Sequence, residues 1–181
     1  MTSAALDRAL VTSHSPVPIS LRFVFRLTAT LATPIAIGDS GQGLRKVVPL
    51  TGGVLESKAD GQLGEGAFDG AQCVGGGADY LTVDARGLSR LDARYVFQLK
   101  SGHYLYFQSS GTRYVPPGDD EASRLLSSGS DIDPRRYYFR LKLVLESDDE
   151  DAGVQGACRS IVVASAVRGA TSIVYDAYVV G

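Results

Sequence analysis

Apolar and polar residues alternate along two long segments of the chain with the two-residue period of a β-strand. In residues 21–32 one face takes Leu21, Phe23, Phe25, Leu27 and Ala29. In residues 135–146 one face takes Tyr137, Phe139, Leu141, Leu143 and Leu145. Each segment is therefore predicted to be a strand that turns its apolar face to a core.

Shorter apolar segments follow one another between glycine-rich turns such as Asp84–Gly87, Ser101-Gly102 and Arg168-Gly169. The further predicted strands are 45–50, a short one after Gly52-Gly53, 78–83, 88–100, 103–108, 160–167 and 171–180. About nine strands at steady spacing with almost no helix are typical of an all-β barrel or sandwich. We predict a single antiparallel β-barrel, because closure removes the exposed strand edges.

Three segments interrupt the strands. Residues 1–19 are expected to form a loose arm, with a helical turn at 5–10 stopped by the prolines that follow, before one barrel domain over residues 20–181. Residues 116–134 are rich in Gly, Pro, Ser and Asp, and predict a short helix at 121–126 capped by Asp119 or Asp120. That long loop is either a lid or disordered. The acidic residues 147–153 are expected to be a solvated loop.

Composition removes several classes of function. The chain has 181 residues and a net charge of −2 with no basic block, which argues against nucleic acid or an anionic membrane as partner. Neither a long apolar run nor a secretory signal is evident, so we expect a cytoplasmic protein in which Cys73 and Cys158 are free thiols. Two histidines and two distant cysteines do not make a zinc site, and the glycine runs lack the lysine of a phosphate loop. We therefore expect no metal and no cofactor.

Polar residues that could carry chemistry gather between residues 44 and 111. Asp92 and Arg94 lie two apart and so share a strand face, with Asp79 on a neighbouring element. Inside the barrel they would form a carboxylate–guanidinium cluster that clamps a ligand oxygen. Alternatively they form a structural or surface ion pair, and the more apolar face with Tyr95 and Phe97 is the inner one.

Two further groups could move a proton. His103 has an ordinary pKa suited to a general base, although its place after a glycine turn suggests a solvated barrel rim. Glu146 ends an apolar strand and would act only if it faced a pocket. Phenols could donate hydrogen bonds to an enolate-like oxygen or simply pack across strands. The tyrosines considered are Tyr80, Tyr95, Tyr104, Tyr106, Tyr137 and Tyr138.

The order of several short motifs resembles the domain-of-unknown-function family numbered 3237. The motifs are Gly52-Gly53, Gly77-Ala78-Asp79-Tyr80, Asp92-Ala93-Arg94-Tyr95, the segment Gly102 to Tyr106, and Tyr138-Phe139-Arg140 with Glu146. The resemblance covers about residues 20–181 and implies a lipocalin-like, calycin-type barrel with small polyketide- or terpenoid-like ligands. Two departures stand out: Lys100-Ser101-Gly102 replaces an Asp-Asp-Gly turn, and Ala157-Cys158-Arg159 replaces a Trp-Leu-Asn element. The pocket is therefore expected to suit a different ligand.

These observations favour a cofactor-independent isomerase or cyclase of a small, oxygenated, apolar metabolite. The expected catalytic residues are Asp79, Arg94, His103 and Glu146. The expected substrate-binding residues are Tyr80, Asp92, Tyr104, Tyr106, Tyr138 and Arg140. A non-catalytic carrier of a small hydrophobic ligand is the alternative, and a structural oligomer such as a homodimer is the weaker third hypothesis.

Overall fold

The computed structural model describes residues 15–39, 41–57 and 66–181, which form ten strands, two α-helices and one 3₁₀ turn. The strands are β1 (Leu21–Leu31), β2 (Ile35–Asp39), β3 (Leu44–Glu56), β4 (Gln72–Asp79), β5 (Thr82–Val83), β6 (Ser89–Gln98), β7 (Tyr104–Tyr114), β8 (Tyr138–Glu146), β9 (Val162–Arg168) and β10 (Ser172–Val180). The helices are α2 (Asp120–Ser128) and α3 (Ala152–Cys158), and the 3₁₀ turn η1 is Pro134–Arg136. The helical turn expected at residues 5–10 lies outside the described residues.

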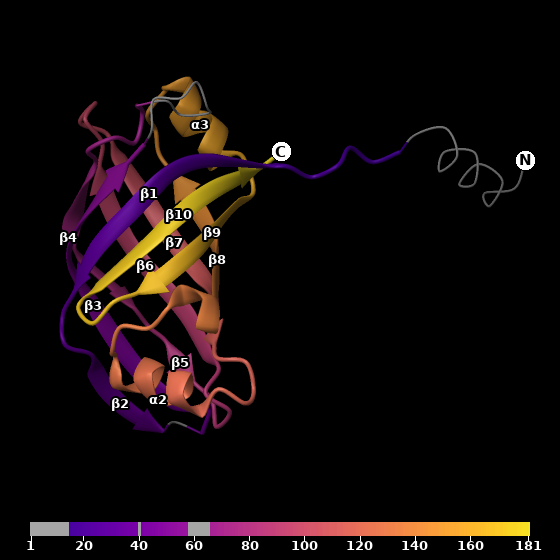
Figure 1. Ribbon diagram of the computed structural model, residues 1–181. Helices are drawn as coiled ribbons and strands as arrows, with labels where there is room; N and C mark the ends of the chain where they lie inside the picture. The colour runs from indigo at the N-terminus through magenta and orange to yellow at the C-terminus, as the bar shows by residue number, and fades with distance from the viewer. Residues whose placement is uncertain (1–14, 40, 58–65) are drawn as a thin grey trace, which may run out of the picture.

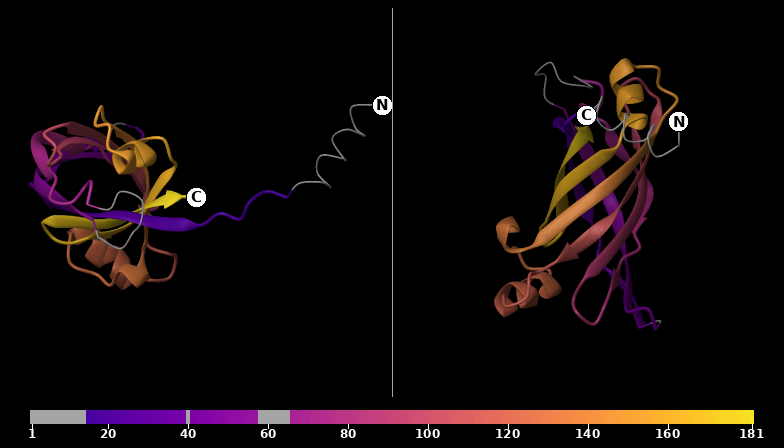
Figure 2. Two further views of the ribbon diagram at one scale, coloured as in Figure 1. Left: turned by 90° about the horizontal axis from the view of Figure 1, so that it is seen from above. Right: turned by 90° about the vertical axis from the view of Figure 1, so that its right-hand side faces the viewer.

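Eight antiparallel strands close into a barrel, which confirms the predicted fold class. The order around the barrel is β1, β10, β9, β8, β7, β6, β4 and β3, and pairing of β1 with β3 completes the circle. Viewed from above, the strands form a ring, from which residues 15–20 lead away (Figure 2). Strands β2 and β5 extend one end of the barrel beyond the ring, beside α2, while α3 lies at the opposite end (Figure 1).

The alternation predicted for β8 is confirmed: Phe139, Leu141, Leu143 and Leu145 are buried and the residues between them are exposed. Strand β6 alternates in the same way, with Ser89, Leu91, Ala93, Tyr95 and Phe97 turned inward. A strand that covers a core on one face and meets water on the other needs this pattern.

The apolar face of β1 is corrected at its beginning. A bulge lies between Phe23 and Phe25 in the pairing with β10, so Val24 and Phe25 are both buried while Leu21 is 58% exposed. A bulge inserts an extra residue and so exchanges the two faces of the strand on one side of it. Strict alternation from Leu21 to Ala29 therefore fails at this one position.

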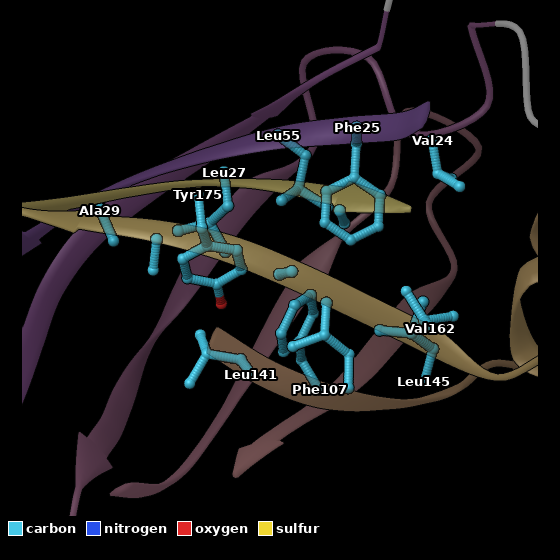
Figure 3. Packing of buried hydrophobic residues seen from close by; sticks show 14 of the residues in the cluster. Val24, Phe25, Leu27, Ala29, Leu55, Phe107, Leu141, Leu145, Val162 and Tyr175 are labelled. Atoms are coloured by element: carbon cyan, nitrogen blue, oxygen red, sulfur yellow. The ribbon is translucent and has the colours of Figure 1, made fainter. Parts of the chain in front are cut away.

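The barrel is packed solid at the end that carries α3. Fully buried aromatic rings fill it, with Phe107 at the centre of contacts to Phe25, Phe97, Tyr95 and Tyr175. Figure 3 shows Phe25, Phe107 and Tyr175 pointing into this interior together with aliphatic side chains such as Leu55 and Leu145. The described side chains at this end therefore form a densely packed core.

Two of the connections between strands carry an α-helix: α2 lies between β7 and β8, and α3 lies between β8 and β9. The helix predicted near residues 121–126 is confirmed as α2, whose N-cap Asp119 accepts a hydrogen bond from the backbone N–H of Ala122 at 3.0 Å. The acidic segment is corrected: Asp149 is buried and Asp151 caps α3, so part of this segment is structural. Cys73 and Cys158 are free thiols, as predicted. No helix in the described part of the chain has the length and apolar character to span a membrane.

Candidate functional site

A cavity of about 490 Å³ opens at the barrel end beside α2. Its apolar wall includes Leu31, Leu44, Val48, Leu50, Leu81, Val83, Leu91, Phe139, Leu141 and Ile173. Its polar groups are Lys46, Asp79, Ser89, Tyr95, Ser109, Arg113, Arg168 and Tyr175, and the last turn of α2 contributes Leu126 to Gly129. An apolar cavity of this size with a few convergent polar groups is typical of a small-molecule site.

Asp79, the last residue of β4, is the carboxyl group of this cavity. Its Oδ1 accepts a hydrogen bond from the backbone N–H of Asp92 on the adjacent strand β6, at 3.1 Å. Burial raises its pKa to about 6, although that hydrogen bond and the charges of Arg113 and Arg168 pull the pKa down. The carboxyl group can therefore both accept and donate a proton near neutral pH.

Two half-buried arginines face the same cavity from β7 and β9. The guanidinium of Arg113 lies 5.6 Å from the centre of the Phe139 ring, and burial lowers its pKa. The guanidinium of Arg168 is held at the β9–β10 turn, where Nη1 donates to the carbonyl of Ser172 at 2.9 Å. Burial also lowers the pKa of Arg168, and the two positive charges repel each other while Asp79 attracts both.

Two tyrosine hydroxyls meet deeper in the barrel. The hydroxyl of Tyr95 hydrogen-bonds to that of Tyr175 and lies 3.3 Å from Oγ of Ser109. Burial raises the pKa of both phenols well above the ordinary value, so both keep their protons. They are neutral hydrogen-bond donors at the inner end of the cavity.

The predicted placement of Asp92 and Arg94 inside the barrel is corrected. Both lie on the outer face of β6, where Arg94 Nη1 is 3.0 Å from Asp92 Oδ2 and the two side chains are 45% and 46% exposed. The alternative face, with Tyr95 and Phe97, is the inner one. Of the expected cluster, only Asp79 points into the cavity.

Four more predicted residues lie at the opposite end of the barrel. His103 is exposed at the β6–β7 turn, where Nδ1 is 2.9 Å from Asp148 Oδ1, a contact that raises the pKa of the imidazole. Glu146 is exposed at the end of β8, opposite Tyr106, and Tyr104 is 55% exposed. None of these four side chains lines the cavity, since their strand positions are at the α3 end.

The remaining three predicted residues lie on the outer surface. Tyr80 is 45% exposed just after β4, although its backbone carbonyl accepts a hydrogen bond from Arg45. Tyr138 stacks on Tyr114, and the guanidinium of Arg140 lies over the Tyr138 ring at 5.4 Å. The stacking of Tyr138 on Tyr114 is a cross-strand surface contact, which is the packing alternative considered for the tyrosines.

Arg113, Arg168 and Tyr175 were not among the predicted site residues, although strand period could have found two of them. Counting by twos from Leu105 and Phe107 on β7 reaches Arg113 on the inner face. The same count from Val162 on β9 reaches Arg168. Within the described residues there is no group of three or more His, Cys, Asp or Glu side chains arranged to hold a metal ion.

The sequence profile of DUF3237, described as "Protein of unknown function", matches residues 19–180. The chain belongs to the DUF3237 family. Two curated relatives are the UPF0311 protein blr7842 of Bradyrhizobium diazoefficiens, 28% identical, and the UPF0311 protein RPA1785 of Rhodopseudomonas palustris, 30% identical. Each alignment covers 88% of this chain and 95% of the relative.

Solved structures of other proteins superpose on this barrel. The crystal structure of RPA1785 superposes with a TM-score of 0.80 and covers 92% of this chain and 100% of that one. A structure described as an enzyme from Penicillium herquei superposes with a TM-score of 0.60 at 15% identity, covering 92% of this chain and 98% of that one. At that identity the second likeness concerns the fold alone.

Replacement of Asp79 by Asn is expected to stabilise the protein in a pH-dependent way. The pKa of Asp79 rises from 3.8 to about 6 on folding, so its contribution to stability is complete below pH 3.8 and is lost as the pH rises through 6. Above pH 6, ionisation of the buried Asp79 lowers the free energy of unfolding by up to about 3 kcal/mol. Asp79→Asn should therefore raise the urea midpoint by the largest amount above pH 6 and by little at pH 3.8.

Far-UV circular dichroism across urea series at several pH values would measure this difference. Glu146→Gln, at an exposed strand end, is the matched control and should give a difference from the native protein that does not change around pH 6. A pH-independent effect of Asp79→Asn would contradict the assignment of a raised pKa to Asp79.

Proposed function

We propose that the protein is an acid–base isomerase or cyclase that acts on a small, oxygenated, mostly apolar metabolite inside this cavity. The observation that carries the proposal is Asp79, a carboxyl group with a pKa of about 6 in an apolar-walled cavity. Proton carriers with pKa values close to the working pH are characteristic of active sites.

In this proposal, Asp79 takes the proton from a carbon atom next to a carbonyl group of the substrate. The electron pair of the broken C–H bond forms a C=C bond with the carbonyl carbon, and the π pair of the carbonyl group moves to its oxygen, which gives an enolate. Return of the proton to another carbon gives an isomer; alternatively, closure of a new bond within the same molecule, followed by return of the proton, gives a ring. Either outcome leaves the elemental composition of the substrate unchanged and regenerates Asp79.

The other polar groups have roles that follow from their charge and position. We assign to Arg113 the guanidinium role that the sequence suggested for Arg94, because Arg113 faces the cavity and Arg94 faces water. A guanidinium in a cavity of low polarity stabilises an enolate oxygen more strongly than it would in water. Tyr95 and Tyr175 keep their protons, and because one hydroxyl donates to the other, the pair can offer one hydrogen bond to a second substrate oxygen.

The comparisons support this proposal only at the level of the fold. The Penicillium herquei protein is described as an enzyme and shares the barrel, so this architecture can carry an active site. A place in specialised metabolism and polyketide- or terpenoid-like substrates remain part of the proposal, from the family resemblance.

The test is to incubate the protein with a metabolite extract of its source in D₂O and to analyse the products by liquid chromatography and mass spectrometry. We expect a compound whose retention time changes without a change of elemental composition, and which gains deuterium at carbon. The native protein and the Arg94→Gln control should produce it at similar rates, and Asp79→Asn should produce it about 10²- to 10⁴-fold more slowly. Formation of the same product by Asp79→Asn at the native rate would contradict the proposal, while tight binding of a compound without its conversion would favour the carrier hypothesis.

A further inference from the structure

We infer that the cavity selects a ligand with a single anionic oxygen group, such as a carboxylate, which binds Arg113 and Arg168 while the apolar remainder fills the cavity. This inference rests on the proposed function in that it names the ligand class of the same cavity.

The charges that face the cavity do not balance. Arg113, Arg168 and Lys46 bring positive charge, and Asp79 is the one carboxylate among the described lining residues. No ion pair joins Asp79 to either arginine among the described contacts. The hydrogen bond of its carboxyl group goes instead from the backbone N–H of Asp92 to Oδ1. Charges removed from water are costly unless they are paired, so this cavity has a deficit of one or more negative charges.

Arg113 lacks the partners that a buried guanidinium requires. Its Nε has no hydrogen-bond partner among the described residues, and its Nη2 makes only a long contact of 3.5 Å with Oγ of Ser89. The Phe139 ring, whose centre lies 5.6 Å from the guanidinium carbon, does not replace these missing hydrogen bonds. A ligand carboxylate can accept two parallel hydrogen bonds from the terminal nitrogens of one guanidinium.

Arg168 differs from Arg113 because the fold itself holds it. Its Nη1 donates to the backbone carbonyls of Gly169 and Ser172, so its position is set before a ligand binds. The positive charge of Arg168 also lowers the pKa of Arg113, which shows that the two charges act on the same region. An anion between them would relieve this repulsion.

The remainder of the cavity favours an apolar body behind the anionic group. Apolar side chains, with leucine the most frequent, make most of the wall, and a volume of about 490 Å³ accommodates a bicyclic skeleton. A ligand that is wholly polar would leave this apolar wall hydrated. The expected ligand class is therefore an apolar monoanion.

Isothermal titration with 1-naphthoate and its neutral isostere 1-naphthamide tests this inference on the full chain. The native protein should bind naphthoate about tenfold more tightly than naphthamide, or ~1.4 kcal/mol. Arg113→Gln should remove this preference by weakening naphthoate and leaving naphthamide nearly unchanged. Arg113→Lys should retain part of it, because the charge remains but the paired hydrogen bonds do not. Arg94→Gln, on the outer face of β6, is the matched control and should bind both probes as the native protein does.

Three results would overturn the inference: equal affinity of the native protein for the two probes, absence of saturable naphthoate binding up to millimolar concentrations, or an equal loss in Arg94→Gln. Should Arg113→Gln fail to fold by circular dichroism, the comparison of two probes on the native protein and on Arg113→Lys still decides. Naphthoate preference together with product formation by Asp79→Asn at the native rate in D₂O would overturn the proposed reaction alone. Product formation that depends on Asp79, without naphthoate preference, would overturn the ligand class alone.

Discussion

Asp79→Asn is expected to reduce kcat by about 10²- to 10⁴-fold once the substrate is identified, which is the usual contribution of one general acid or base. The amide can still accept the hydrogen bond from the backbone N–H of Asp92, so the geometry at the end of β4 is retained. It cannot take up a proton at any accessible pH. The loss should appear in kcat rather than mainly in KM, because proton transfer belongs to the chemical step.

The pH dependence gives this prediction a second measurement. With Asp79 as the base of the free enzyme, kcat/KM should increase as the pH rises through about 6 and then level off. The residual activity of Asp79→Asn should lack this step. His103→Gln and Glu146→Gln are the matched controls, since both positions lie at the other end of the barrel. An equally large loss of kcat in either control would move the proton carrier away from Asp79.

The two effects expected for Asp79→Asn have opposite signs, and both follow from burial. A carboxyl group whose pKa is raised by an apolar cavity weakens the folded protein above pH 6 and gives it a proton carrier near neutral pH. A residue kept for stability alone would lose stability on replacement. The combination of a more stable and less active variant would therefore identify Asp79 as a functional residue.

The two-residue period of the strands predicted most of the barrel, but it did not decide which face of β6 points inward. Both faces of β6 carry polar residues near its beginning, with Ser89 on one side and Asp92 and Arg94 on the other. The pair Asp92 and Arg94 suggested a ligand site because a carboxylate and a guanidinium can bind substrate oxygens. The two side chains instead form an ion pair with each other in water on the outer face. The apolar residues Leu91, Tyr95 and Phe97 share the other face, and burial of that face decides the orientation.

Other features depend on contacts between distant residues. The bulge at Phe23 in β1 arises in its pairing with β10, about 150 positions away, and no local pattern marks it. Arg168 ends β9 beside a glycine turn, where a sequence suggests a solvated charge, and it becomes a cavity residue only because β8 and β10 close around it. Helix α3 begins after its N-cap Asp151. In the sequence Asp151 stands in a run of acidic residues, so its capping role could not be told apart from that of a solvated charge.

Gly111→Ala is expected to destabilise the protein by about 3 kcal/mol or more, which is the upper part of the range for overpacked positions. Gly111 lies in β7 between its partners Leu91 on β6 and Leu141 on β8. A Cβ atom at this position would overlap the carbonyl oxygen of Arg140 and lie 2.9 Å from Cα of Leu141. Both are backbone atoms, so relief requires that β7 and β8 move apart and lose ladder hydrogen bonds. Only a residue without a side chain allows the two strands to approach this closely.

The measurement is the urea midpoint by far-UV circular dichroism, since the chain has no tryptophan to report by fluorescence. Gly75→Ala is the matched control, because Gly75 is also a strand glycine, in β4, but a Cβ there meets nothing within 4 Å. Gly75→Ala should change stability by less than about 1 kcal/mol, and a small gain is expected from its stiffer unfolded chain. Equal effects of the two substitutions would mean that β7 and β8 are not in the close contact described. Because the same two strands carry Arg113 and Phe139, Gly111→Ala should also weaken naphthoate binding in any fraction that folds.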